Sequence, residues 1–141
     1  FGNTAPTSTH FYVGDPGNAR SNVNDGLYMA MLFASANNAD GDPISKVGSY
    51  VGSDSEQTIT TGFQPRFVII KGRDSSFMDW YVLDTLRGWS SGNDPYLALN
   101  SNSQQGGSSD WGAPTSTGFT LTGNQFAFND SGYNYIYYAH A

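Results

Sequence analysis

Tryptophan residues in polar loops are the first candidates for chemistry in this sequence. Trp89 lies in "RGWSSGND" and Trp111 ends "NSNSQQGGSSDW". A sugar ring packs its C–H face on an exposed indole, while side chains such as Asn93 and Asp94 bind its hydroxyl groups. The pattern predicts a carbohydrate-binding surface formed by Trp89, Trp111, Asn93 and Asp94. The alternative is that the tryptophans pack in the core, the interpretation favoured for Trp80 within "DWYVL".

Basic residues gather between Arg66 and Arg87, where they alternate with aspartates. One interpretation is a polar binding cleft. The favoured interpretation is a structural ion-pair motif of Lys71, Arg73, Asp84 and Arg87 that joins adjacent strands. Asp84 and Arg87 are close enough in sequence to share the turn "DTLRG".

Residues for catalysis and metal binding are sparse. The chain has two histidines, His10 and His140, one glutamate, Glu56, and no cysteine. No nucleophile-elbow motif is present, and nothing singles out a carboxylate pair for glycoside hydrolysis. Asp- and Asn-rich loops such as "NNADGDP" lack the distal glutamate of an EF-hand, so turn chemistry is favoured over Ca²⁺ binding, which stays open. We expect no catalytic residue, no cofactor and no metal site.

The composition excludes several classes of partner. The net charge is −6, and charged residues make up only 13% of the 141 residues. Nucleic-acid binding requires a basic face, so we expect no nucleic-acid partner. No apolar run is long enough to span a bilayer, so we also expect no membrane insertion.

Apolar alternation and turn residues predict a succession of short strands. Aromatic residues reach 15%, whereas Lys and Glu, which normally fill helix surfaces, are nearly absent. We therefore predict an all-β fold, an antiparallel β-sandwich of jelly-roll type with little or no helix. The expected strands cover residues 10–14, 27–35, 45–51, 57–61, 66–72, 79–86, 96–100, 118–122, 125–129 and 133–141.

The pentapeptide "APTST" occurs twice, at 5–9 and at 113–117. Aligning the copies places Phe11 opposite Phe119, an offset of 119 − 11 = 108. After a small gap, "NDGLYMAMLFASA" (24–36) lies over "NDSGYNYIYYAHA" (129–141), an offset of 105. Chance recurrence explains the pentapeptide alone, but not several motifs in the same order.

The repeat predicts the domain organisation. Residues 1–36 form the closing strands of a preceding repeat copy, packed on the main domain or on a neighbour. Residues 37–141 form a complete repeat unit. We expect Phe11–Gly14 and Leu27–Ser35 to be paired in sheets, within the chain or across to another one, because unpaired edges are unfavourable.

The region from Val47 onward resembles an uncharacterised repeat domain of tailed-phage virion proteins, among them tail-fibre and particle-surface proteins. The resemblance rests on "GSYVGSDSEQTITTGFQPRFVIIKGRDSS", "DWYVLDTLRG" and "STGFTL…NDSGYNYIYYAHA". It implies a non-enzymatic structural or adhesion module at a virion surface or outside the cell. Its implied partners are copies of itself in a trimer or larger assembly, other virion proteins, and a host-surface glycan. The alternatives are an architectural fibre or capsid-surface subunit without ligand and, less favoured, a glycan-cleaving enzyme.

Overall fold

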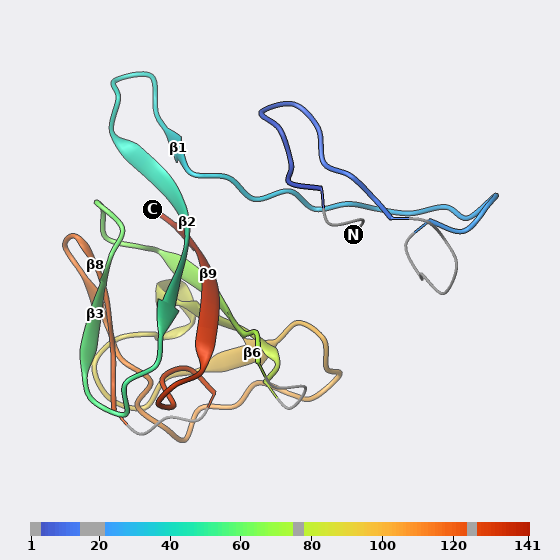
Figure 1. Ribbon diagram of the computed structural model, residues 1–141. Helices are drawn as coiled ribbons and strands as arrows, with labels where there is room; N and C mark the ends of the chain where they lie inside the picture. Colours follow the sequence, from blue (N-terminus) through green and yellow to red (C-terminus); the bar gives the residue numbers. More distant parts are fainter. Residues whose placement is uncertain (1–3, 15–21, 75–77, 124–126) are drawn as a thin grey trace. The chain divides into compact units, whose positions relative to one another are not determined.

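The chain divides into two compact units, Phe1–Leu32 and Phe33–Ala141 (Figure 1). The computed structural model describes residues 4–14, 22–74, 78–123 and 127–141. All strands assigned within these ranges belong to the second unit. The division into repeat copies after residue 36 stays a prediction.

The second unit is built from short strands and one turn of 3₁₀ helix, η1 (Thr85–Arg87). The strands are β1 (Ala36–Asn37), β2 (Pro43–Val51), β3 (Gln57–Thr60), β4 (Phe67–Gly72), β5 (Trp80–Asp84), β6 (Tyr96–Ala98), β7 (Pro114–Thr115), β8 (Gly118–Leu121) and β9 (Asn134–His140).

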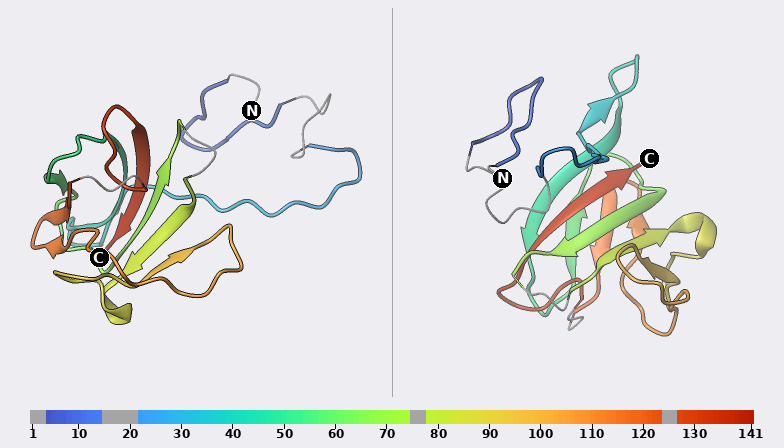
Figure 2. Two further views of the ribbon diagram at one scale, coloured as in Figure 1. Left: turned by 90° about the horizontal axis from the view of Figure 1, so that it is seen from below. Right: turned by 90° about the vertical axis from the view of Figure 1, so that its right-hand side faces the viewer.

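These strands form two antiparallel sheets. The larger sheet has the order β1-β2-β9-β4-β5-β6, and the smaller has the order β3-β8-β7. Figures 1 and 2 show β3 and β8 side by side in a layer of their own, beside the layer that contains β2, β9 and β4. The C-terminal strand β9 is therefore central, between β2 and β4.

The core lies between the two sheets. Alternate residues of β4 and β9 are buried, among them Ile70 and Tyr135. From the smaller sheet, Phe119 contacts the Tyr137 ring edge-on, with 5.6 Å between ring centroids. The contact joins the inner faces, as expected for a sandwich. The predicted all-β antiparallel sandwich with little helix is confirmed.

Gly48 shows how a small residue accommodates a large one in this core. Gly48 of β2 is the cross-strand partner of Tyr137 of β9. A Cβ atom added to Gly48 would lie 2.6 Å from the Tyr137 hydroxyl oxygen. The tyrosine therefore lies across the glycine, and a larger residue would displace it.

A buried amide joins loops that are distant in sequence. Asn129 is fully buried; its Nδ2 donates to the carbonyl oxygens of Ser55 (2.7 Å) and Thr122 (2.9 Å). Its Oδ1 accepts from the Ser53 N–H (3.1 Å) and from Gln57 Nε2. This side chain thus connects the β2–β3 connection to the β8–β9 connection, and each of its hydrogen-bonding groups is satisfied.

The two strands predicted before residue 36 are not formed within the chain. Residues 10–14 and 27–35 have no assigned strand. Pairing with another chain stays a prediction. A third expected strand, 125–129, lies partly outside the described residues, and its described part, 127–129, is a turn.

Candidate functional site

The tryptophans predicted to bind sugar are core residues. Trp89 is 2% exposed and Trp111 is 6% exposed, so the expected exposed platform is wrong. Trp89 Nε1 donates to the carbonyl oxygen of Gly112 (2.7 Å), and the Trp111 ring meets Phe128 edge-on, with 3.8 Å between centroids. The loops around both tryptophans are polar, but the indoles turn inward because burying such large apolar surfaces is strongly favourable.

Asp94, the predicted sugar ligand, is a buried structural carboxylate. Its oxygens accept hydrogen bonds from the main-chain N–H groups of Ser90 (3.1 Å) and Trp111 (2.8 Å). Burial raises the pKa of Asp94, while these two hydrogen bonds oppose the rise. Of the four predicted residues, Asn93 alone is exposed, so the four side chains form no common surface.

The predicted ion-pair motif has different partners. Within the described part of the chain, the Asp84 carboxylate forms its ion pair with Arg66 (3.7 Å), not with Arg87. Asp84 also caps η1 by accepting from the Leu86 N–H (2.8 Å), and Arg87 donates instead to Gln105. The turn is therefore held by a cap rather than by the expected ion pair, because a carboxylate at the cap accepts an otherwise unpaired N–H.

The other two residues of the motif are held by backbone groups. Lys71 Nζ donates to the carbonyl oxygens of Gly72 (2.8 Å) and Met78. The Arg73 main-chain N–H donates to the Asn134 carbonyl oxygen (2.8 Å). Both residues form hydrogen bonds at the end of β4, and these bonds are to main-chain groups rather than within a cluster of charged side chains.

The outer face of the six-stranded sheet presents apolar side chains from several neighbouring strands. Strand register places one apolar residue from each of five strands in a single cross-strand row. We call this surface the outer face; its central row is Val47, Tyr138, Ile69, Val82 and Leu97. All five side chains are exposed or half-buried, although their chemistry is that of a core.

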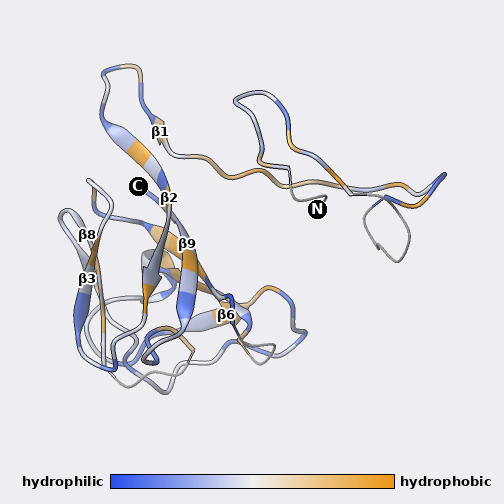
Figure 3. Ribbon diagram, viewed as in Figure 1, coloured by the Kyte–Doolittle hydropathy of each residue, from blue (hydrophilic) through white to orange (hydrophobic). Residues whose placement is uncertain are grey.

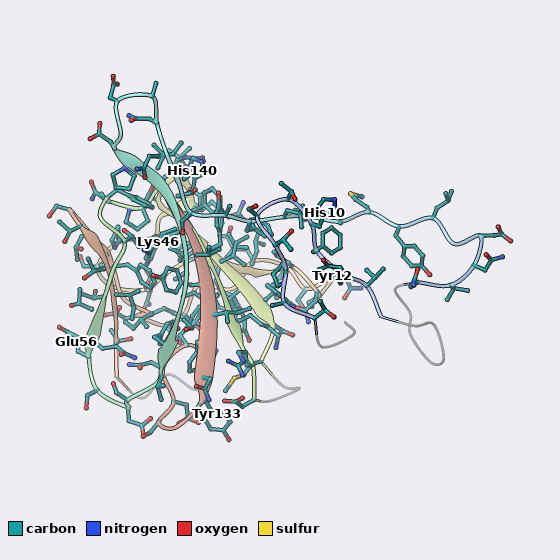
Figure 4. All side chains as sticks on the ribbon, turned by 45° about the horizontal axis from the view of Figure 1, so that its top comes forward. His10, Tyr12, Lys46, Glu56, Tyr133 and His140 are labelled. Carbon is teal, nitrogen blue, oxygen red and sulfur yellow. The ribbon has the colours of Figure 1, made fainter. Side chains whose placement is uncertain are left out.

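Aromatic rings cover one end of the outer face. Phe67 stacks on His140 at 5.6 Å with 5° between the ring planes, and it contacts Tyr138 at 5.9 Å. Phe33 adds a ring 4.7 Å from Tyr138. Figure 4 shows His140 at the C-terminal end of β9 and Tyr133 beyond the opposite end of the strand. The cluster therefore belongs to the β9 end where the chain terminates.

Trp80 lies toward the other end of the outer face. The expectation that it is a core residue is wrong. It is 40% exposed and is the cross-strand partner of Lys71. Its main-chain N–H donates to Asn100 Oδ1 (2.8 Å), and Asn100 Nδ2 donates to Asp79 Oδ1 (2.8 Å). These polar groups fix the backbone of Trp80 and leave the indole facing outward.

The outer face presents apolar and aromatic side chains that a partner could bury. Among the described residues, no group of three or more His, Cys, Asp or Glu side chains is placed to hold a metal ion. Nor does any helix in the described ranges have the length and apolarity to cross a bilayer.

The apolar character of the outer face is visible in the sequence. The strands "RFVIIKG" and "YNYIYYAHA" are apolar on both sides. This pattern is typical of a central strand, and β4 lies between β9 and β5. It also implies that both faces of the sheet need covering, whereas the smaller sheet covers one face of the larger.

Comparison with known proteins places the chain in a family without assigning an activity. No curated protein and no solved structure matches it. A family model described as a domain of unknown function, DUF7483, matches residues 1–141. The match covers both units, Phe1–Leu32 and Phe33–Ala141. The chain therefore belongs to the DUF7483 domain family.

Proposed function

We propose that this protein is a non-enzymatic structural module of a virion surface that assembles with further copies of itself. The observation that carries the proposal is the apolar, incompletely covered outer face of the six-stranded sheet. Monomeric soluble proteins rarely expose large contiguous apolar patches, and such patches mark interaction sites. The virion location comes from the sequence resemblance.

A second copy of the same face is the partner that the charge distribution favours. Residues of the central row, such as Ile69 and Val82, carry no charge. At its border the Asp84 carboxylate is paired with Arg66, and Lys71 donates to main-chain carbonyl groups. A neutral apolar patch is self-complementary, which is the requirement for a twofold contact between identical surfaces.

Acidic side chains in structural roles support a non-enzymatic module. Asp94 and Asp84 accept main-chain N–H groups. Asp74 accepts both the main-chain N–H and the Nδ2 of Asn134, each at 2.7 Å, and these bonds lower the pKa of Asp74. These carboxylates accept hydrogen bonds that stabilise loops and strand ends.

Sedimentation velocity over a wide range of protein concentration tests the proposal. The wild type is expected to associate, and Val47→Asp or Trp80→Asp is expected to shift it toward monomer. Leu86→Asp is the matched control, because Leu86 is 78% exposed but lies in η1 and not in a strand of the outer face. A monomeric wild type at every concentration, or equal effects of Val47→Asp and Leu86→Asp, contradicts assembly through the outer face.

A host-surface glycan is the second candidate, and Trp80 is the residue that favours it. The indole is exposed, with the polar side chains of Asn100 and Asp79 nearby in the hydrogen-bonded chain described above. An array of bacterial surface glycans tests this function. Binding that is lost in Trp80→Ala and kept in Asn93→Ala supports it, and the absence of binding to the array argues against it.

A further inference from the structure

We infer that residues 5–14 and 22–35 are a set of closing strands that completes the two sheets of another module of this fold. The inference deepens the proposed assembly function and rests on it, but it concerns a different contact from the outer face. Its starting point is the role that the equivalent segment, residues 113–140, has in the second unit.

In the second unit, the closing strands β8 and β9 supply inward-facing residues to both sheets. Phe119 and Leu121 come from β8, and Tyr135, Tyr137 and Ala139 come from β9. All five are buried. The connection between these strands adds Phe128 and Asn129, the buried amide that joins two loops.

The segment 11–34, which runs from the first unit into the start of the second, carries apolar residues at each of these inward positions. The offsets of 108 and 105 place Phe11 and Val13 at the two β8 positions, and Ala30, Leu32 and Ala34 at the three β9 positions. The same offset of 105 places Val23 opposite Phe128 and Asn24 opposite Asn129. The burial pattern of the closing strands is thus matched residue by residue, which composition alone does not explain.

The backbone of the first unit keeps one element of the closing strands. Thr115 and Gly118 are partners across the β7–β8 hairpin. Their counterparts under the offset of 108 are Thr7 and His10, and the Thr7 N–H donates to the His10 carbonyl oxygen at 2.8 Å. The turn forms in the first unit although no strand is assigned beside it.

The first unit leaves its own apolar side chains uncovered. Leu27 is 100% exposed and Leu32 is 75% exposed, and Figure 3 shows the run of hydrophobic residues that precedes β1. Within this unit, Phe11 and Val13 line an open apolar cleft with Leu32, and its volume is about 530 Å³. Apolar side chains on both sides of an open cleft are suited to receive the core of a partner.

The acceptor must supply strands equivalent to β2, β3 and β4. In the second unit, β9 pairs with β2 and β4, and β8 pairs with β3 and β7. The second unit fills these positions with its own closing strands, so the acceptor is a module that lacks them. Such strand addition supplies main-chain hydrogen bonds, and the buried alternate side chains provide register.

One position departs from the pattern. A Cβ atom at Gly118 would lie 2.0 Å from the Ile59 carbonyl oxygen, whereas the first unit has His10 there. The acceptor's counterpart of β3 must therefore leave more room than β3 does. If residues 5–36 are to replace the closing strands of this chain, the copy must therefore contain the substitution His10→Gly.

A graft in the full chain tests the inference. Residues 113–141 are replaced by a copy of residues 5–36 with His10→Gly, and a second graft adds Ala30→Tyr and Leu32→Tyr to fill the volume of Tyr135 and Tyr137. Both grafts are expected to unfold cooperatively, the first at a lower midpoint because of its cavities, and to protect the amides of β2 and β4 from hydrogen exchange. A graft with residues 5–36 in scrambled order is expected to lose both properties.

Register is tested in the filled graft. Ala34→Asp, at an inward position, is expected to abolish exchange protection of β2 and β4, whereas Met31→Asp, at an outward position, is expected to keep it. A filled graft that is no better protected than the scrambled one, or equal effects of the two aspartates, overturns the inference. Self-association of the wild type through the outer face, measured by sedimentation velocity, does not depend on this result. Either proposal can therefore fail without the other.

Discussion

The Trp111 main-chain N–H donates to Asp94 Oδ2 at 2.8 Å, and both residues are buried. This bond ties the loop after η1 to the segment that enters β7. Two residues with the chemistry of an exposed sugar site are instead part of the framework of the sandwich. The carboxylate satisfies main-chain donors that would otherwise be buried without partners.

Asp94→Ala is expected to lower the free energy of unfolding by about 2–3 kcal/mol, because the N–H groups of Ser90 and Trp111 lose their acceptor. Urea denaturation measures the change. Asp40→Ala is the matched control at an exposed site, and its expected effect is within about 0.5 kcal/mol. Equal effects of the two variants would contradict the structural role of Asp94.

Asn129→Ala is expected to destabilise the second unit by about 2–4 kcal/mol, because it removes the amide that joins Ser55 to Thr122. Hydrogen exchange is expected to increase first in the β2–β3 and β8–β9 connections, which the Asn129 side chain joins. Asn93→Ala, at an exposed position, is the control. If both asparagine variants unfold at the same urea concentration, the hydrogen bonds of Asn129 do not stabilise the fold.

Trp80→Phe is expected to remove most of the iodide-quenchable tryptophan fluorescence, because Trp80 is exposed while Trp89 and Trp111 are buried. Trp89→Phe is expected to retain the quenchable component and to lower stability, since it loses the Nε1 bond to Gly112 and aromatic packing. A quenchable fraction that follows Trp89 rather than Trp80 would reverse this assignment.

Alkaline pH is expected to destabilise the second unit. Burial raises the pKa of Tyr135 to about 12, above the value of about 10 for an unfolded tyrosine. The unfolded state therefore loses a proton first, so this contribution is complete below pH about 10 and is lost as the pH rises to about 12. Urea denaturation across this window measures the slope.

Tyr135→Phe is expected to flatten that decline. Part of the slope should remain, because burial also raises the pKa of Tyr50, which stacks on Tyr135 at 5.0 Å. Identical slopes in the wild type and in Tyr135→Phe would show that Tyr135 is not the source.

The sequence alone determined the fold class and most of the strands. Alternation in "QTITT" and the two-sided apolar runs "RFVIIKG" and "YNYIYYAHA" correspond to β3, β4 and β9. These features are local, since strand propensity and turn residues act over a few positions. The division at residues 36 and 37 that the repeat predicts stays a prediction.

Only the tertiary structure decided which way the side chains face. In "DWYVLD" both sides of the strand are apolar, so the sequence does not distinguish the face of Trp80 from the face of Tyr81. Register with β4 and β6 turns Tyr81 inward and Trp80 outward. Trp89 and Trp111 lie in polar loops, and their burial depends on contacts with β8 and the β8–β9 connection. Such long-range contacts form only when the sheets pack, so they cannot be predicted from the residues adjacent in sequence.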